Sequence, residues 1–476
     1  MADDLAVSAF KECARLNAAY AEVRVEKTRA NSFSLKNGVL EDSASSASEG
    51  LSVRVVTGGG SGFAASNELT RKAATEAAAK AFALAVSAAA FNDKPVTFTR
   101  EASYYVDYEV RQKKALKDLS PDDRIGYLKA LDAAALATKV HLPMRYLAVG
   151  DWTTQKFYEN TEGTRIRSTV PRIHLFYAIA AVEGGASQQF MFQFGSSGGW
   201  EFAESWHADL KIAEQARTLK RALTKGKSAP KESVDLVVGP YVSGIAAHES
   251  CGHPSEADRI MGREAAQAGE SFIEVDMLGS RIGSQEATVI DDPSLPNSYG
   301  HYLFDDEGVK SGPRRLYDAG RIGTFLHNRQ TAAALDLPHS NGSSRAESYA
   351  DEPIVRMGNT YVAPGDHSVE ELFEGVKLGV YVKDFMEWNI DDKRYNQKYV
   401  GTEAYLIKNG RVGAPVRNPV IELTTPAFWS AVDARAKDVD YFSATCGKGD
   451  PMQGAPVFMG GPSMRLRDIR LGGASK

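Results

Sequence analysis

The sequence predicts an α+β fold in two parts, a mixed α/β N-terminal lobe over residues 1–225 and a β-rich C-terminal lobe over residues 226–476. Two observations lead to this prediction. The first part interleaves helical stretches with runs of alternating apolar and polar residues, which are typical of half-buried strands. The second part follows a linker-like Lys-Gly-Lys-Ser-Ala-Pro at 225–230 and consists mostly of strand-like runs separated by turns.

The first segment is predicted to be a helix, several strands and a second helix. Residues 5–19 have the spacing of an amphipathic helix, and residues 68–90 are alanine-rich and strongly helical. Between them, apolar residues at every second position indicate strands, two of which are joined by a hairpin at Lys36-Asn37-Gly38. The glycine run at 58–62 lacks the lysine of a phosphate-binding loop and is predicted to be a turn.

The next segment follows a mixed connector at 92–119. Ser120 and Pro121 form a helix-start signature, for a helix that extends to about residue 139. Several strand-like runs from Met144 to Phe194 indicate an antiparallel meander. Residues 209–224 then place their apolar side chains on one face of a further helix.

The C-terminal part contains hairpin patterns at 316–322 and 404–412. Acidic stretches at 291–293 and 305–308 are expected to be solvated turns, because neither has the ligand spacing of an EF-hand calcium loop. The glycine- and proline-rich tail at 447–461 is expected to be a loop that passes close to a functional site.

Charge and cysteine content exclude several classes of function. The formal net charge of the 476 residues is −5, which gives no reason to expect general affinity for nucleic acid or for membrane surfaces. The N-terminus is acidic and no long apolar run follows, so neither a signal peptide nor a transmembrane helix is expected. Three cysteines, Cys13, Cys251 and Cys446, do not make a disulfide framework and favour a reducing, cytoplasmic compartment.

The most informative stretch is His248-Glu249-Ser250-Cys251-Gly252-His253. It follows a strand-like run at 234–238, and the helical spacing of apolar residues from Tyr241 onward predicts that it lies on a helix. In zinc peptidases with the His-Glu-x-x-His motif, histidines four residues apart face one metal. Here the spacing is five residues, which on a straight helix turns the second imidazole about 140° past one revolution. One ion can be shared only if the helix contains a π-bulge or ends between the histidines. Gly252 and Pro254 supply the second option.

A metal held by two histidines needs a third protein ligand, and the best candidate is Cys446, far downstream. The set His248, His253 and Cys446, with one position open for water, suits zinc at one ion per chain. Glu249 is then placed to act as general base, so the predicted chemistry is hydrolysis of a polarised carbonyl. Cys251 competes as the soft ligand, but its position on the Gly252 turn favours a small buried residue.

These motifs resemble the TldD branch of the TldD/PmbA family of zinc metallopeptidases. The resemblance covers nearly the whole chain in order, including its first strands and several downstream segments. Its parts outside the histidine motif are Tyr20–Arg24, Gly50–Arg54, Asn341–Tyr349, Arg356–Tyr361, Glu403–Ile407 and Cys446–Lys448.

The resemblance implies that His248, His253 and Cys446 bind zinc and that Glu249 is catalytic. It also implies proteolysis of short or unfolded polypeptides inside a closed dimer, either a homodimer or a heterodimer with a PmbA-like subunit. The residues predicted to contact substrate are Asn341, Arg345, Glu347 and Tyr349.

Two stretches depart from the family pattern. Pro-Ser-Glu-Ala-Asp follows His253 where Gly-Leu-Glu-Gly-Asp is usual, and residues 385–392 replace a glycine-rich stretch. The latter run is expected either to border the cleft or to form a solvated loop with one buried aromatic. Two other functions stay open: a non-catalytic partner subunit or binding module with a structural metal site, and a cysteine hydrolase that uses Cys251.

Overall fold

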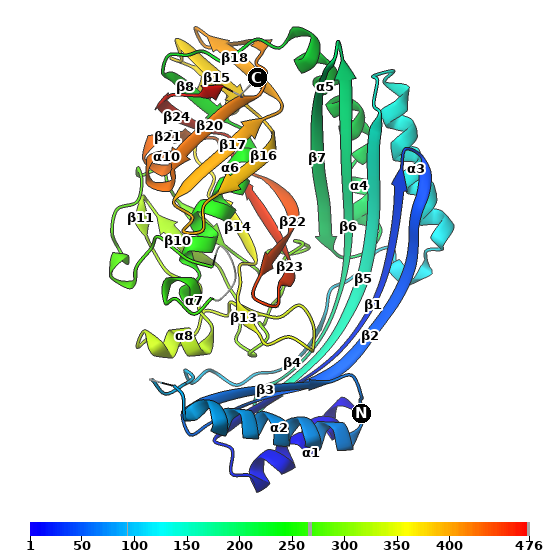
Figure 1. Ribbon diagram of the computed structural model, residues 1–476, viewed down its shortest axis with the longest axis vertical. Helices are drawn as coiled ribbons and strands as arrows, with labels where there is room; N and C mark the ends of the chain where they lie inside the picture. The colour runs from blue at the N-terminus through cyan, green and yellow to red at the C-terminus, as the bar shows by residue number, and fades with distance from the viewer. Residues whose placement is uncertain (93, 265–268, 474–476) are drawn as a thin grey trace.

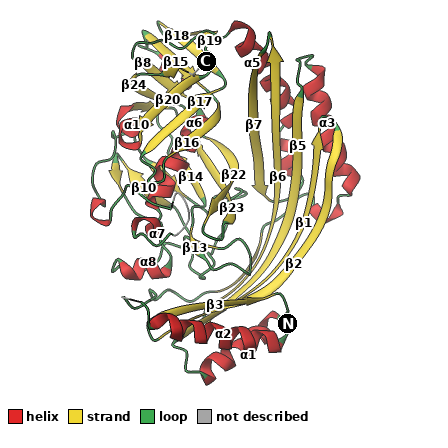
Figure 2. Cartoon of the chain, viewed as in Figure 1, coloured by secondary structure: helices red, strands yellow, loops and turns green. Residues whose placement is uncertain are grey.

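A long, curved sheet frames the molecule, and the C-terminal half of the chain packs against its concave side (Figure 1). The computed structural model describes residues 1–92, 94–264 and 269–473. The predicted α+β class is confirmed, because helices line the outer side of the frame and strands dominate the rest (Figure 2). In the part of the chain that the structure describes, no helix combines the length and the apolar character that crossing a membrane requires.

Seven strands build this frame in the order β3-β2-β1-β5-β6-β4, with β7 also paired to β6. Strands β5, β6 and β7 pair antiparallel in sequence, which confirms the predicted meander. The hairpin between β1 and β2 turns at Asn37 and Gly38, whose φ angles of 50° and 82° are the positive values that a tight two-residue turn requires. The strands are β1 Tyr20–Lys36, β2 Val39–Thr57, β3 Gly60–Ser66, β4 Tyr105–Glu109, β5 Met144–Asn160, β6 Arg165–Glu183 and β7 Ala186–Ser197.

The helices of the N-terminal half lie on the outer side of the frame. The first and second cover its lower end, and the third and fifth cover its upper end (Figure 1). The first helix starts and ends earlier than predicted, since Asp3 and Asp4 favour its start and Asn17 adopts a left-handed φ of 59° after its end. These helices are α1 Ala2–Arg15, α2 Arg71–Ala89, α3 Pro121–Ala137, α4 Glu201–Ser205 and α5 Ala208–Lys225, with a 3-10 turn η1 at Leu116–Asp118.

Three larger sheets and a two-stranded one form the C-terminal half, with short helices between them. The first sheet has the order β11-β10-β9-β14-β23-β22, the second β19-β18-β15-β8-β24-β21, and the third β16-β17-β20-β25. Their strands are β8 Val234–Val238, β9 Val289–Asp291, β10 Arg314–Asp318, β11 Arg321–Ile322, β14 Asn359–Val362, β15 Leu378–Val382, β16 Phe385–Ile390, β17 Asn396–Gly401, β18 Ala404–Lys408, β19 Arg411–Pro415, β20 Pro419–Thr424, β21 Val432–Arg435, β22 Asp440–Lys448, β23 Gln453–Gly461, β24 Met464–Ile469 and β25 Gly472–Gly473. The small sheet pairs β12 Ser344–Arg345 with β13 Ile354–Val355. The helices and turns are α6 Pro240–Ala247, η2 His248–Gly252, η3 His253–Ser255, α7 Ala257–Ile260, η4 Val275–Met277, α8 Arg329–Ala334, α9 Val369–Phe373 and α10 Thr425–Ala431.

Two stretches expected to be irregular are strands. The connector at 92–119 contains β4, which pairs parallel with the start of β6. The tail expected to be a loop at 447–461 instead belongs to the hairpin of β22 and β23, in which Cys446 pairs with Ala455. The distant partners β6 and β14 supply backbone hydrogen bonds to β4 and β23, and the glycines of the hairpin do not prevent the pairing.

The two acidic stretches are buried, which contradicts the expectation of solvated turns. Asp291 forms an ion pair with Arg314, with 2.5 Å between Oδ2 and Nη2. Asp305 accepts hydrogen bonds from the backbone N–H groups of Glu307, Val309 and Ser344. These carboxylates therefore brace loops of the interior, because partners distant in sequence satisfy them there.

One hydrophobic core joins the frame to the C-terminal half. It includes Ile179 on β6, Ile212 on α5, Val242 on α6 and Val457 on β23. A second, separate core fills the space beneath α1 and α2. The helix α6 therefore belongs to the rigid interior, which suits an element that carries a reactive site.

The contact between α2 and β3 is close enough to test. A Cβ atom added at Gly62 on β3 would collide with the backbone carbonyl oxygen of Ala81 on α2. We expect Gly62→Ala to destabilise the protein by about 1–3 kcal/mol, because overpacking forces two backbones apart. The measurement is the midpoint of thermal unfolding, which should fall.

Gly126 provides the matched control, since it lies in the interior of α3 and a Cβ atom there would meet nothing within 4 Å. Gly126→Ala should stabilise the protein by about 0.5–1 kcal/mol, because alanine loses less backbone freedom on forming a helix. Equal midpoints for the two variants would contradict the close packing of α2 on β3.

Candidate metal centre

The helix that carries the histidine motif widens within the motif itself. The α-helix α6 passes into the π-turn η2 at His248, where the backbone N–H of His253 donates to the carbonyl oxygen of His248, five residues earlier. The predicted helix distortion is confirmed, and it takes the form of a π-turn, which was one of the two predicted possibilities. The other option, a left-handed exit at Gly252, is wrong, because that glycine has φ −60° and ψ −61°.

Side chains from distant elements hold the widened turn. The hydroxyl of Ser250 donates to the carbonyl oxygen of Ala246 at 2.6 Å, and the hydroxyl of Tyr317 donates to the carbonyl oxygen of Ser250 at 3.1 Å. A Cβ atom at Gly252 would collide with the sulfur of Met357, so glycine is required here for close approach. The sequence therefore folds into a π-turn because residues distant in sequence form hydrogen bonds with its irregular backbone and pack against it.

The π-turn brings His248 and His253 together with Cys446 on β22. One ligand atom of each lies within 4.8 Å of the others, and all three residues are buried. The imidazole rings are 4.8 Å apart between centroids, and Cys446 Sγ lies 3.4 Å from His253 Nε2. Among the described residues, nothing hydrogen-bonds the buried Nδ1 of His248. Two imidazoles and a thiol with an unsatisfied buried nitrogen fit a zinc ion.

A buried ionic cluster contacts His253 at Nδ1, the ring nitrogen opposite the one that faces Cys446. Glu256 Oε2 lies 3.0 Å from His253 Nδ1 and accepts a bond of 2.6 Å from Arg259 Nε. Lys448 Nζ, two residues after the cysteine, is 3.4 Å from Glu256 and 2.7 Å from Asp258. Burial opposes ionisation of Glu256, but the Lys448 ammonium holds its pKa well below the ordinary value. A carboxylate behind a histidine fixes the ring orientation that a metal ligand needs.

Glu249 faces the same centre and has one strong partner. Arg394 Nη1 donates to Glu249 Oε2 at 2.6 Å, and in the described part of the chain Oε1 makes no hydrogen bond. Burial would raise the pKa of Glu249, but the charges of His253 and Arg394 outweigh it and keep that pKa below its ordinary value. Glu249 is therefore a carboxylate with one oxygen anchored and the other free.

Arg394 was not predicted from the sequence. It stands in the turn between β16 and β17 with a left-handed φ of 64°, immediately after the atypical 385–392 run. That run forms strand β16, with Phe385 buried and Trp388 partly exposed, and is not a solvated loop. The departure from the family pattern was the signal that pointed to this region, although it did not identify the arginine.

The other two thiols differ sharply from Cys446. Burial raises the pKa of Cys251 well above its ordinary value, and burial likewise raises the pKa of Cys13 to about 11. Burial acts in the same direction on Cys446, but the positive charge of His253 lowers its pKa to about 7. Cys251 is also outside the ligand group found among the described residues. Its environment suits a packed thiol and gives it neither the ligand role nor the nucleophile role.

The four predicted substrate contacts separate into two kinds. Arg345 and Glu347 line one cavity between the frame and the C-terminal half. Asn341 instead accepts the backbone N–H of His327 and donates to the carbonyl oxygen of Phe325, which braces a loop. Tyr349 packs its ring against Gly50 on β2. The structure thus brings two of the four together in one cavity, whose lining does not include Asn341 or Tyr349.

Metal content tests the ligand assignment. We expect the purified protein to carry about one zinc ion per chain. Cys446→Ser should lose most of it, because a hydroxyl is a poor substitute for a thiolate. Cys251→Ser is the matched control and should retain the metal, since that thiol lies outside the group. Elemental analysis of both variants gives the answer, and equal retention would contradict the assignment.

Comparison with known proteins extends the resemblance seen in the sequence. Three family models match in order: PmbA/TldA metallopeptidase domain 1 at residues 21–89, the central domain at 114–225 and the C-terminal domain at 231–473. The chain is 30% identical to a metalloprotease of Methanothermobacter thermautotrophicus, over 95% of both chains. It is 24% identical to a zinc metalloprotease TldD homolog of Saccharolobus solfataricus, over 98% of this chain and 99% of the relative.

The crystal structure of TldE from Thermococcus kodakarensis has the same fold, with a TM-score of 0.74 at 17% identity over 99% of each chain. The C-terminal family model alone covers more than half of the residues, and the resemblance predicted from the motifs is confirmed. The chain belongs to the PmbA/TldD family of metallopeptidases.

Proposed function

We propose that the protein is a zinc-dependent metallopeptidase that hydrolyses short or unfolded polypeptides. The observation that carries the proposal is the convergence of His248, His253 and Cys446 on one point beside the ionised Glu249. The metalloprotease names of its relatives support the same reaction class, and one of those names includes zinc. His248, His253 and Cys446 would hold one ion per chain.

A zinc ion bound there would lower the pKa of a water molecule and polarise the scissile carbonyl. Glu249 is the general base, which accepts the proton of the attacking water on its free oxygen Oε1 and can return it to the leaving amine. Arg394 holds Oε2 and so fixes the direction in which Oε1 points. The ammonium of Lys448 and the carboxylate of Glu256 keep His253 in one orientation during the reaction.

A closed dimer completes the proposal, formed with a second copy or with a PmbA-like chain. Residues 39–49 of β2 are exposed, and no strand of the described chain pairs with their outer edge. An unpaired edge of this length is a ready surface for another chain. The three cysteines are free thiols, which supports a reducing, cytoplasmic setting.

The general-base role has a direct test. Glu249→Gln should keep the metal and the fold but lose peptidase activity by about 100-fold or more, because an amide cannot accept the proton. Glu422→Gln, an exposed position on β20, is the control for a lost carboxylate and should keep full activity. A metal-loaded Glu249→Gln enzyme with normal activity would remove this role. A wild type that has no peptidase activity and loses stability when its zinc is removed would favour the non-catalytic alternative with a structural metal site.

Substrate selection tests the enclosed site. A compact folded protein and the same chain denatured or cut into peptides should be offered to the enzyme separately. We expect several cleavages in the unfolded chains and survival of the folded form. Only an extended segment can enter the enclosure and reach the metal, where its main chain can form hydrogen bonds with a strand of the wall. Sedimentation at micromolar concentration should show a dimer in the same sample. Comparable cleavage of the folded form would indicate an open cleft.

A further inference from the structure

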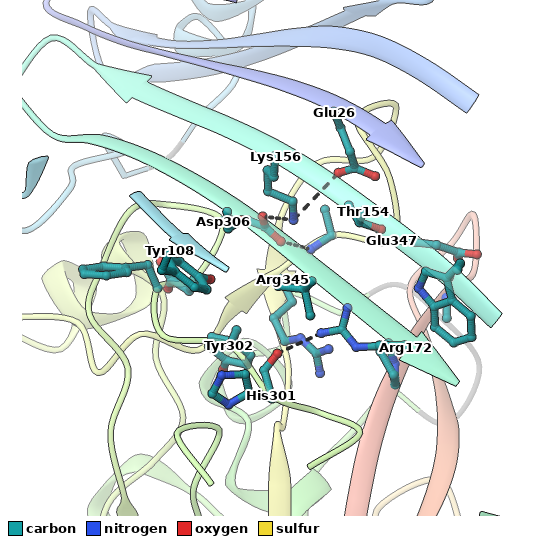
Figure 3. A pocket seen from close by; sticks show the side chains of 18 residues that line it. Glu26, Tyr108, Thr154, Lys156, Arg172, His301, Tyr302, Asp306, Arg345 and Glu347 are labelled. Atoms are coloured by element: carbon teal, nitrogen blue, oxygen red, sulfur yellow. Dashed lines mark hydrogen bonds and ion pairs between the residues drawn. The ribbon is translucent and has the colours of Figure 1, made fainter. Parts of the chain in front are cut away.

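A cavity of about 110 Å³ lies where the concave face of the frame meets the C-terminal half (Figure 3). Strands β5 and β6 supply one wall, and the loop at 301–306 and the segment at 345–347 supply the other. Gly454 stands at its rim and pairs across the hairpin with Gly447, the residue after Cys446. The cavity therefore adjoins the strand that carries the cysteine but is separate from the ligand group.

Two arginines from opposite walls turn their guanidinium groups toward each other in this cavity, Arg172 from β6 and Arg345 from β12 (Figure 3). Their exposed fractions are 9% and 7%. Among the described residues, Arg172 donates to the carbonyl oxygens of Tyr299 and His301. Arg345 donates to the carbonyl oxygen of Met357 and lies over the ring of Tyr302. Within the described residues neither forms an ion pair. Burial, and then the charge of Arg345, lowers the pKa of Arg172 to about 10.

Four acidic groups line the cavity, and each has a partner other than the two arginines. Asp306 pairs with Lys156 at 2.5 Å and accepts the backbone N–H of Ala346, and Glu26 lies 3.8 Å from the same Lys156 ammonium. Asp305 accepts the backbone N–H groups of Glu307, Val309 and Ser344. Glu347 accepts the backbone N–H of Gly454 at the rim. In the described part of the chain, neither guanidinium group therefore has a carboxylate of the cavity as an ion-pair partner.

We propose that this cavity binds an oxyanion, a carboxylate or a phosphate, between Arg172 and Arg345. Two buried cations side by side are costly unless an anion joins them. Guanidinium groups donate paired N–H bonds whose geometry matches both carboxylate and phosphate oxygens. The free N–H groups of both arginines face a space large enough for such a group and a short attached chain. The inference concerns binding and does not depend on the peptidase reaction.

Two sources share this chemistry, and the experiment separates them. Titration calorimetry on the metal-loaded wild type uses three probes: inorganic phosphate, N-acetyl-diglycine with a free carboxylate, and the same peptide as its uncharged amide. Binding of the carboxylate alone identifies a peptide chain end, and binding of phosphate alone identifies a free phosphate. Binding of both supports a general oxyanion site. Binding of neither anion, or of the amide as tightly as the carboxylate, overturns the proposal.

Variants assign the binding to the cavity. Arg345→Gln should lower the affinity for the anion by about tenfold or more, because it removes charge-assisted hydrogen bonds. Arg315→Gln is the matched control, since Arg315 pairs with Asp318 on the surface and lies outside the cavity. If Arg345→Gln does not fold, Arg345→Lys keeps the charge but loses the paired donors, and should also bind more weakly. Unchanged affinity in the folded Arg345 variant would show that the anion binds elsewhere, for example at the metal, and would overturn the proposal.

Discussion

Two imidazoles five residues apart can face one ion only where the helix widens, and this constraint organises the C-terminal half. The π-turn from His248 to Gly252 needs partners for its displaced backbone groups. Tyr317 on β10 donates to the carbonyl oxygen of Ser250. Trp429 on α10 donates its indole N–H to the Ser250 hydroxyl, which itself donates to the carbonyl oxygen of Ala246. Met357 closes the remaining side against Gly252. Segments spread over more than a hundred residues thus converge to support one irregular turn.

The electrostatic arrangement follows from the burial of this turn. Charges removed from water are tolerated only when close partners replace the solvent. Lys448, Glu256 and Asp258 satisfy one another behind His253, and Arg314 satisfies Asp291 on the neighbouring sheet. Each such pair joins two segments distant in sequence, so the network fixes their relative position as well as their charge. The reactive groups are consequently oriented before any ligand arrives, which is the arrangement that catalysis by fixed dipoles and charges requires.

The sequence was a good guide to local regularity and a poor one to long-range contacts. Alternation and turn chemistry predicted the frame strands and the Asn37-Gly38 hairpin, because both are determined within a few residues. The five-residue histidine spacing predicted the helix distortion, since helix geometry alone demands it. Strand β4 was missed because its pairing partner lies far away in the chain. The hairpin of β22 and β23 was missed because its glycines and prolines suggest a loop, although the two strands pair with each other and β23 also pairs with the distant β14.

The candidate site shows the same division. The histidines and Glu249 were identifiable from their spacing, whereas Arg394 approaches from 145 residues away and no local pattern marks it. Asp305 looked like a surface residue because aspartate in a turn usually is one, and only the three backbone donors around it explain its burial. Asn341 lies in a segment that resembles the family, yet both polar atoms of its side-chain amide form hydrogen bonds with the backbone of the loop at 325–327.

The distance in sequence between the ligands has a consequence for biosynthesis. His253 and Cys446 are separated by 193 residues, and the cysteine lies on a strand close to the end of the chain. A ribosome that adds about 5–20 residues per second needs roughly 10–40 s to cover that interval. An ion held by all three ligands therefore cannot be bound until Cys446 has been synthesised. The histidine turn is synthesised first, but the centre is completed only after Cys446 has been added, so a chain truncated before that residue would be released without it.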